Sequence, residues 1–442
     1  MNPDRDARNL AAVAPALIDP VVGIIGSVKE VARNPGGPQF FHYSATAANT
    51  SAFTRQENFF AGGGASSIRD IAVSKAIGES VERYCSAIYD VDELPLHSCD
   101  ESDTPCVNPG QFALYQSWQY EQDGFPFVSF ENDTPIRWAE GHDPLTGESW
   151  LVPAAMVYSP YYYYQGSGDS PICQNISTGL ACHLSPYRSA LSGFYEVIER
   201  DCFTLTWLAM CAPSQIRIET LDDRNYELIR RIQKAPCEIN LFDITMDTGV
   251  PTILSTLRWV SDEAPALVVA ASTDLSPSEA TRKALEELVH TNRYSQQITS
   301  HSPPLDEDSE FRNIDSQATH LQFYCDPENL SAAEFLFSSR ERKDFDEIKN
   351  LSSGIVKKDL IFILRRLREL GYQGLVTELT SEDVAGIGLS VTRSIIPGFH
   401  PLSMGHDLRP LGGKRLREVP QLMGYPGIGK DGLGNPYPHP YP

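Results

Sequence analysis

The chain has 442 residues and a formal net charge of −22, from 58 acidic and 36 basic side chains. This balance argues against a protein that wraps nucleic acid, because neutralising phosphates requires a basic surface. Hydrophobic residues make up 41% of the chain, which is ample for a packed core. No apolar run approaches the ~18 residues of a membrane span, and the start, MNPDRDARNL, has no signal-peptide pattern. We therefore expect a cytoplasmic protein that contacts neither nucleic acid nor membrane.

Hydrophobic spacing predicts a long amphipathic helix in the first quarter of the chain. Val73, Ile77 and Val81 recur four residues apart, which places them on one face of a helix over 68–89. Period-two patterns and turn residues predict strands at 20–30, 39–48 and 125–131, and a hairpin over 136–159 whose turn is DPLTGE. A second long helix is expected over 186–209.

Strands and helices alternate through the second half of the chain. Ser276 followed by Pro277 is a typical start signal, so a helix is expected from there to Tyr294. The other expected elements are strands at 215–219, 238–245, 252–259, 266–272 and 389–397, and helices at 222–234, 332–350 and 355–371. Residues 299–318 are polar and acidic, and we expect them to form an exposed loop.

The end of the chain, GLGNPYPHPYP, is rich in proline. Its prolines fix φ and remove backbone donors, which favours an extended segment over a helix or a central strand. No shift in composition divides the residues before it. We therefore expect an α+β protein with one large domain over 1–430, internally repeated helix–strand elements, and an extended tail over 431–442.

Nine cysteines are scattered from Cys85 to Cys325 without a CxxC pair. An odd, dispersed set is typical of reduced thiols and not of a disulfide framework or a structural zinc site. The closest pair that could bind a metal is Cys99 and Cys106, in the polar loop HSCDESDTPC. We expect free thiols, with metal binding by this pair as the less favoured alternative.

A short helical pattern occurs twice, as ESVERYC at 79–85 and EVIERDC at 196–202. Residues three and four apart share a helix face, so Glu79 and Glu82 are neighbours and Arg83 lies one turn from Glu79. The second copy has the same residue types at the matching positions: Glu196, Glu199 and Arg200. Taken singly, either copy is an ordinary surface ion pair worth a few tenths of a kcal/mol.

The recurrence of the pattern changes its interpretation. Two such helices packed side by side would bring four carboxylates and two guanidiniums into one cleft. Clustered carboxylates are costly without a cation, and Mg²⁺ prefers oxygen ligands while keeping phosphate and water in its shell. The arginines would hold phosphate oxygens. The pattern therefore predicts a magnesium–nucleotide site built without a phosphate loop.

Two further stretches bear on such a site. In ATRKALEELVHTNR, Glu287 lies on a helix between Arg282 and Arg293, which is a weaker third echo of the pattern. GYPGIGKD at 424–431 matches half of a phosphate loop, with Lys430 at the lysine position. A proline lies inside it and no helix is expected after it, so the amides of a helix N-terminus are missing. We therefore reject a phosphate loop there.

Several segments together match a known family. They are IAVSKAIGESVERYC, ISTGLACH with SALSGFYEVIERDC, ATRKALEELVHTNR, VTRSIIPGFHPL and GGKRLREVP, and a PxPxP ending formed by Pro438, Pro440 and Pro442. On these segments the chain resembles the YcaO superfamily over nearly its whole length, most closely the azoline-forming peptide cyclodehydratases. The ending is the most specific feature, since it resembles the mark of the heterocyclising branch. Without the two repeated turns, a solvated tail or a docking peptide would be the favoured interpretation of it.

The resemblance implies that ATP lies between the helices that carry the two repeated turns. Glu79, Glu82, Glu196 and Glu199 would ligate Mg²⁺ or support its ligands. The triphosphate contacts would come from Arg83 or Arg200 together with Arg282 or Arg293. The tail would reach back into the active site, where Pro438, Pro440 and Pro442 would act in catalysis and the terminal carboxylate would accept a proton.

The reaction that the resemblance implies is ATP-dependent cyclodehydration of a ribosomal precursor peptide. A Cys, Ser or Thr side chain attacks the preceding amide carbonyl, ATP phosphorylates the resulting oxyanion, and loss of phosphate leaves a thiazoline or oxazoline. Relatives of this architecture work with a separate partner, similar to ubiquitin-activating enzymes, that captures the leader peptide. We expect such a partner, and a flavin-dependent azoline dehydrogenase acting afterwards.

Three positions depart from the family pattern. AGGGASS replaces the usual Gly-Lys-Gly, Arg188 stands where relatives often carry an acid, and Ser177-Thr178-Gly179 replaces Ser-Asn-Gly. A basic residue in place of a metal ligand would weaken Mg²⁺ binding, and Arg69 is a candidate for the missing cation. A degenerate, non-catalytic scaffold subunit is therefore one alternative, and a thioamide-forming enzyme is another.

Overall fold

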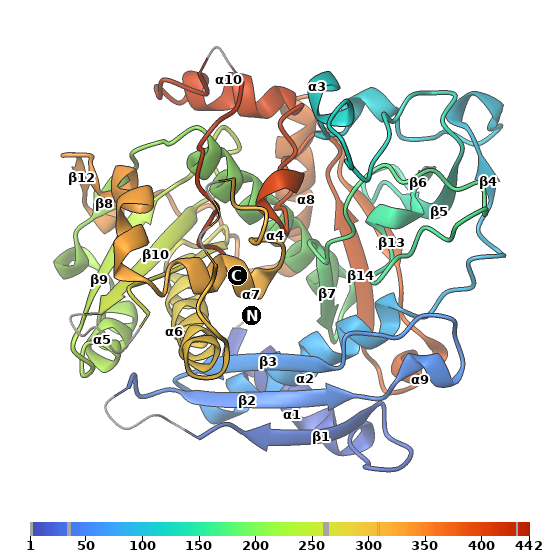
Figure 1. Cartoon of the computed structure of the whole chain (residues 1–442). Helices are drawn as coiled ribbons and strands as arrows, with labels where there is room; N and C mark the ends of the chain where they lie inside the picture. Colours follow the sequence, from blue (N-terminus) through green and yellow to red (C-terminus); the bar gives the residue numbers. More distant parts are fainter. Residues whose placement is uncertain (1–2, 33–36, 260–264, 307, 309, 430–431) are drawn as a thin grey trace.

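Three short strands, each at the edge of a sheet, lead directly into long helices (Figure 1). The computed structural model describes residues 3–32, 37–259, 265–306, 308, 310–429 and 432–442. Within them, the strand–helix units are β3 (Ala61–Ser66) with α2 (Arg69–Ser86), β7 (Leu180–His183) with α4 (Pro186–Leu208), and β11 (Leu267–Thr273) with α6 (Pro277–His301). The expected α+β architecture with repeated helix–strand elements is confirmed.

The strands of the described residues form three sheets. One antiparallel sheet has the order β1 (Ile25–Glu30), β2 (Phe41–Ala47), β3. A second has the order β11, β10 (Thr252–Trp259), β9 (Cys237–Asp243), β8 (Ser214–Ile216), β12 (Arg342–Lys343). The third has the order β4 (Leu96–His97), β5 (Ile136–His142), β13 (Leu375–Glu378), β14 (Ser390–Ile395), β7, with β6 (Ser149–Pro153) beside β5. Each of β3, β7 and β11 is thus an end strand, with one edge of its backbone left without a strand partner.

Helix α4 connects the second and third sheets, because it packs against β7 and β14 on one side and against β10 and β11 on the other. Its largest fully buried side chains are Phe194, Phe203 and Trp207. The remaining helices are α1 (Pro3–Leu17) on α2, α5 (Asp223–Ile232) and α7 (Gln317–Phe323) on α6, α8 (Val356–Glu369) and α10 (Lys414–Leu422) on α4, and the short α3 (Ser117–Tyr120) and α9 (Glu382–Gly386). Among the described residues, no helix has the length and apolar character needed to cross a membrane.

The glycines of AGGGASS let β3 lie tightly between α2 and α6. A Cβ on Gly64 would come within 2.4 Å of the Ala72 carbonyl oxygen on α2. On the opposite side of the strand, a Cβ on Gly63 would lie 2.4 Å from the His290 ring of α6. A side chain at Gly64 would therefore force α2 away and one at Gly63 would displace the His290 ring, which explains why the segment has no larger residues.

Two expected elements are wrong. Residues 125–131 form no strand, because Phe125 and Phe127 pack around Tyr115 in an aromatic cluster and Pro126 has no N–H for a ladder. Residues 332–350 form no α-helix. A 3-10 helix ends there at Phe337, and β12 then pairs in parallel with β8, so a contact distant in sequence overrides local helix propensity.

The other long elements are confirmed, with shifted ends. Helix α6 continues to His301, seven residues beyond the expected end at Tyr294 and into the predicted loop over 299–318. The hairpin of β5 and β6 encloses the predicted DPLTGE turn. All nine cysteines are free thiols, as expected, and no group of three or more His, Cys, Asp or Glu side chains in the described residues is arranged to hold a metal by itself.

The described part of the tail, 432–442, contains neither helix nor strand, as its prolines predicted. Hydrogen bonds to its backbone carbonyls hold it in the fold. Tyr324 Oη donates to the Pro438 oxygen at 2.7 Å, and Trp207 Nε1 donates to the Tyr437 oxygen at 3.2 Å. Residues from Pro438 to Tyr441 are buried, so the alternative of a solvated tail is wrong. Lys430 and Asp431, at the end of the rejected phosphate-loop match, lie outside the described residues.

A buried ion-pair network joins α10 to α4. The Arg415 side chain is 1% exposed and donates to Asp201 of α4 at 2.7 and 2.9 Å and to Asp247 at 2.6 and 2.9 Å. Its guanidinium also lies 4.1 Å from the centre of the Phe399 ring. Two buried carboxylates therefore depend on one cation, which holds α10 in place against the helix that carries the second acidic turn.

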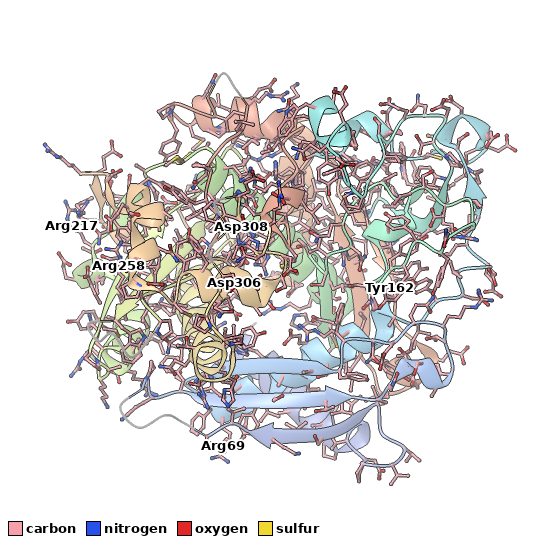
Figure 2. All side chains as sticks on the ribbon, viewed as in Figure 1. Arg69, Tyr162, Arg217, Arg258, Asp306 and Asp308 are labelled. Atoms are coloured by element: carbon pink, nitrogen blue, oxygen red, sulfur yellow. The ribbon has the colours of Figure 1, made fainter. Side chains whose placement is uncertain are left out.

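Replacing Arg415 with Met should destabilise the protein by about 3–5 kcal/mol, because two buried carboxylates lose their counter-charge. The midpoint of thermal unfolding measures this effect. The control is Arg217→Met, since Arg217 pairs with Asp344 at the surface (Figure 2) and should change stability by less than about 0.5 kcal/mol. Equal effects of the two substitutions would contradict the role of the buried network.

Candidate active site

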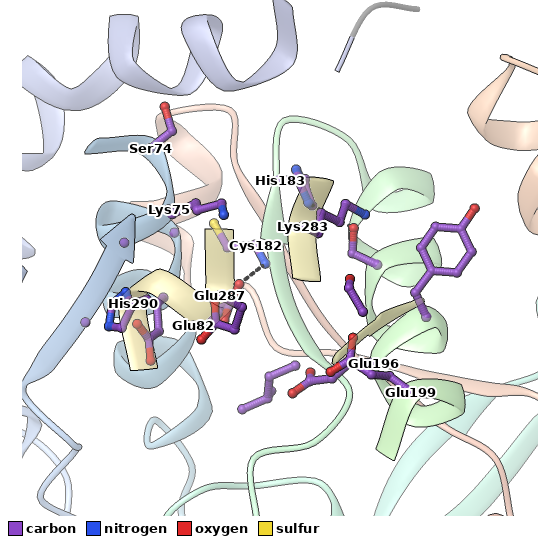
Figure 3. A pocket seen from close by; sticks show the side chains of 18 of the residues that line it. Ser74, Lys75, Glu82, Cys182, His183, Glu196, Glu199, Lys283, Glu287 and His290 are labelled. Atoms are coloured by element: carbon purple, nitrogen blue, oxygen red, sulfur yellow. Dashed lines mark hydrogen bonds between the residues drawn. The ribbon is translucent and has the colours of Figure 1, made fainter. Parts of the chain in front are cut away.

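The two repeated acidic turns face one cavity of about 1350 Å³ (Figure 3). Glu79 and Glu82 line it from α2, and Glu196 and Glu199 line it from α4. Glu287 of α6 lines the same cavity (Figure 3). The predicted convergence of the two acidic helix faces is confirmed, while their role as metal ligands stays a prediction.

Each of the four predicted carboxylates accepts a hydrogen bond from a backbone N–H. The donors and distances are Gly63 to Glu79 at 2.5 Å, Cys182 to Glu82 at 2.7 Å, Gly179 to Glu196 at 3.0 Å and Thr273 to Glu199 at 3.2 Å. Gly63, Cys182 and Thr273 belong to the end strands β3, β7 and β11, and Gly179 immediately precedes β7. The free edges of three sheets therefore orient the carboxylates, and each keeps lone pairs for a cation.

Gly179, in the Ser-Thr-Gly segment that departs from the family pattern, can only be glycine. Its φ is +93°, and a Cβ there would lie 2.2 Å from the Ser394 carbonyl oxygen. This conformation presents its N–H to Glu196. Ser177 and Thr178, the two residues before it, line the cavity.

Burial leaves two of the carboxylates poorly compensated. Desolvation, with the charges of Glu79 and Glu196 nearby, raises the pKa of Glu82 to about 8. Desolvation raises the pKa of Glu199 to about 7, although Arg200 and a hydrogen bond from Tyr441 oppose this change. Among the described residues Glu82 forms no ion pair, so a bound cation would stabilise its charged form.

The arginines of the two turns are engaged with the carboxylates of their own helices. Arg83 Nη2 lies 2.6 Å from Glu79 Oε1, and Arg83 also donates to the Ala61 carbonyl of β3. Arg200 Nη2 lies 3.3 Å from Glu196 Oε1. Both arginines line the cavity. To contact a triphosphate as predicted, each would have to share its guanidinium between the phosphate and its glutamate, or give up the glutamate.

The two predicted arginines of α6 differ in their environment. Arg282 is buried and pairs with Glu279 at 2.9 Å and with Glu286 at 2.6 Å. Arg293 lines the cavity, and its buried Nε has no hydrogen-bond partner among the described residues. Of these two, Arg293 therefore has the guanidinium without an ion pair among the described residues, which suits an anionic ligand.

Two lysines that the sequence analysis did not select line the same cavity (Figure 3). Lys75 Nζ lies 2.7 Å from Glu286 Oε2, and Lys283 Nζ lies 2.8 Å from Asp274 Oδ2. A signal for both was present, since KAIGE in α2 and KALEE in α6 each place a lysine one turn before a cavity glutamate. The same repeat marks Glu287 as the third-helix counterpart of Glu79.

Arg69, the candidate for the missing cation, and Arg188, the basic departure from the family pattern, lie in different environments. Arg69 is exposed, pairs with Glu30 at 3.2 Å and does not line the cavity, so its expected role as the missing cation is wrong (Figure 2). Its side chain leaves the first turn of α2 on the solvent side. Arg188 does line the cavity; burial, with the nearby charges of Arg188 and Lys283, lowers the pKa of His183 to about 3.

The tail enters the cavity only at its last residue among those described. Pro442 lines the cavity, and its backbone oxygen accepts a hydrogen bond from Arg200 Nη1 at 3.5 Å. Pro438 and Pro440 are buried before this point and do not line the cavity. Any part they take in catalysis is therefore the placement of Pro442.

The donor set fits Mg²⁺ bound together with a nucleotide. Because no three acidic or histidine side chains in the described residues can hold a metal by themselves, a cation would need further ligands from phosphate and water, which is how Mg²⁺ usually binds. The second oxygen of Glu82 would suit a cation, and the Arg293 guanidinium, which lines the same cavity, would suit an anion.

A family model described as "YcaO cyclodehydratase", ATP- and Mg²⁺-binding, matches residues 56–400. The match confirms the resemblance predicted from the sequence, and with it ATP and Mg²⁺ as the cofactors of the family. The proline-rich tail lies beyond the matched residues.

Three solved structures share the fold. A heterocyclase in complex with substrate and cofactor has a TM-score of 0.79 at 19% identity, covering 98% of this chain and 57% of that one. YcaO from Methanopyrus kandleri, bound with AMPPCP and Mg²⁺, has a TM-score of 0.63 at 16% identity, covering 89% and 90%. A chain of the E. coli microcin synthetase McbBCD complex has a TM-score of 0.57 at 15% identity, covering 93% and 96%. This chain thus spans just over half the length of the matched heterocyclase.

The raised pKa of Glu82 predicts how stability changes with pH in the metal-free protein. Between its ordinary pKa of 4.5 and its folded value of about 8, the folded state holds a proton that the unfolded state has lost, so stability should fall as pH rises. Glu82→Gln should make the midpoint of thermal unfolding less dependent on pH over this range. The control is Glu93→Gln, which changes an exposed carboxyl outside the cavity lining. This variant should keep the wild-type slope. A wild-type slope in Glu82→Gln would contradict the burial of this charge.

Proposed function

The chain belongs to the YcaO cyclodehydratase family, and we propose that it is an ATP-dependent cyclodehydratase that converts Cys, Ser or Thr of a ribosomal precursor peptide into thiazoline or oxazoline. The observation that carries this proposal is that Pro442 of the proline tail lines the cavity formed by the acidic faces of α2 and α4. On this proposal, the magnesium-bound nucleotide and the tail would share one space.

The residues of the cavity would hold the cofactors from three sides. Glu79 and Glu82 would bind Mg²⁺ from α2, Glu196 and Glu199 would bind it from α4, and Arg293 would bind phosphate oxygens from α6. When bound, ATP supplies the phosphoryl group that turns the amide oxygen into a leaving group. The contribution of the protein is electrostatic positioning, since backbone N–H groups fix the carboxylates before any ligand enters.

The tail would provide the base. Prolines limit the freedom of the segment, so its end can be placed at the cavity at a small entropic cost. A carboxylate at the end of Pro442 would be suited to take the proton of the attacking thiol or hydroxyl. Pro438 and Pro440 would act by placing it. Arg200, which contacts both Glu196 and Pro442, would keep this end beside the carboxylates of α4.

The substrate and partner follow from the same proposal. The substrate would be a precursor peptide delivered by a separate leader-binding protein similar to ubiquitin-activating enzymes, with a flavin-dependent azoline dehydrogenase acting afterwards. The McbBCD complex and the heterocyclase in complex with substrate, whose fold this chain shares, support work with a peptide and other proteins.

The test combines the purified protein with its partner, precursor peptide, ATP and Mg²⁺, and measures the mass of the peptide. We expect the loss of one water per ring, coupled to ATP hydrolysis. Glu82→Gln and Glu199→Gln should each lower ATP turnover about 100-fold or more, because a carboxylate facing Mg²⁺ is lost. Glu93→Gln is the matched control and should react at the wild-type rate.

Two other results would identify the alternatives. Exchange of oxygen for sulfur in the peptide would point to thioamide formation. An unchanged mass with tight binding of partner and peptide would point to a non-catalytic scaffold subunit, the alternative that the cationic Arg188 in the cavity favours. Either result would contradict cyclodehydration.

Deletion of Tyr441 and Pro442 tests the tail separately. Ring formation should fall about 100-fold or more because the proposed base is removed, whereas binding of AMPPCP with Mg²⁺ should weaken by no more than about tenfold. The control is Pro436→Ala, at an exposed tail position before the PxPxP motif, which should keep its activity. Ring formation at the full rate after the deletion would show that the tail has no catalytic part.

A further inference from the structure

Tyr441, between the last two prolines, joins the tail to a carboxylate of α4. Its side chain is buried, with 1% exposed, and its ring centre lies 4.2 Å from that of Phe203. The guanidinium of Arg200 lies over the ring, 4.5 Å from its centre. The hydroxyl donates a hydrogen bond to Glu199 Oε1 at 2.7 Å. The ring is therefore fixed by packing, and its hydroxyl is aimed at Glu199.

Glu199 is held on both of its oxygens. The Thr273 N–H of β11 donates to Oε2 at 3.2 Å, and Tyr441 donates to Oε1. Two donors on different oxygens fix the plane of the carboxylate while leaving lone pairs for a cation. One donor comes from a sheet edge. The other comes from a segment 242 positions further along the chain.

The second support of Glu199 differs from that of the other carboxylates. Glu79 and Glu196 have arginines one turn along their own helices at 2.6 and 3.3 Å. Arg200 approaches Glu199 only to 3.9 Å. The phenol of the tail therefore does for Glu199 what a neighbouring guanidinium does for Glu79 and Glu196.

We propose that Tyr441 is a positioning residue, whose hydroxyl sets the orientation of Glu199 so that seating of the tail completes one wall of the metal–nucleotide site. The inference rests on the proposed function in one respect, because it takes Glu199 as a ligand of Mg²⁺. It assigns the tail a part in cofactor binding that is separate from any proton transfer at Pro442.

Tyr324 provides a matched control. Its hydroxyl, also buried, donates to the Pro438 carbonyl oxygen at 2.7 Å and so anchors the same tail. It has no hydrogen bond to Glu199. Tyr441→Phe and Tyr324→Phe each remove one phenolic oxygen that holds the tail, but only the first removes a donor to the carboxylate.

The experiment measures binding of Mn²⁺, as a paramagnetic substitute for Mg²⁺, to the full-length protein in the presence of AMPPCP, followed by electron paramagnetic resonance. Tyr441→Phe should raise the dissociation constant of Mn²⁺ about tenfold, the lower range for a lost hydrogen bond to a charged group. Tyr324→Phe should leave this constant within about twofold. Thermal unfolding of both variants checks that the fold is intact.

Each outcome decides the inference. Equal weakening by both substitutions would mean that the tail needs only to be anchored, and no weakening by Tyr441→Phe would mean that Glu199 is oriented without it; both overturn the proposal. A wild-type protein that binds no Mn²⁺ with AMPPCP overturns it as well. Tenfold weakening together with an unchanged peptide mass in the reaction assay would support the role of Tyr441 while refuting cyclodehydration.

Discussion

Hydrogen bonds from sheet edges to carboxylates are the interaction on which the site depends. A bare edge is usually a liability, because its N–H and C=O groups can pair with another chain. Here Glu82 binds the edge of β7 and Glu199 binds the edge of β11, so an exposed donor and a costly buried acceptor satisfy each other. A hydrogen bond to a charged group contributes about 1.5–3 kcal/mol. The raised pKa values of these two carboxyls show that this contribution does not fully offset burial.

The same plan is repeated with different supports. In each strand–helix unit an end strand is followed by a helix whose glutamates face the cavity, and the three sheets supply its walls. On α2, Arg83 supports the first carboxylate, Glu79. On α4, Tyr441 of the tail supports the second carboxylate, Glu199. The glycines of β3 bring α2 and α6 close enough for Lys75 to pair with Glu286 across the strand. The buried Glu286 binds both Lys75 and the buried Ser66, and these contacts tie the units together.

Periodicity and repetition made much of the fold and of the acidic site predictable. The stripe of α2 and the Ser-Pro start of α6 are local signals, and the repeated ExxER turns marked the carboxylates. Short strands such as β7 and the glycine-rich β3 have no alternation to detect, and β12 exists only because it pairs with β8. The role of Arg69 as the missing cation was wrong. Its place in the sequence near Glu79 did not show that its side chain leaves α2 on the solvent side. The bond from Tyr441 to Glu199 depends on where the tail lies, which no local pattern encodes.

The separation in sequence of the cavity walls has a consequence for folding. Ser66 binds Glu286 across 220 positions, and Glu199 binds Tyr441 across 242. Closing such long loops is slow relative to forming local helices, so the three units should acquire their helices before the cavity exists. The ability to bind nucleotide would then appear late in folding, only once the whole polypeptide has reached its native topology.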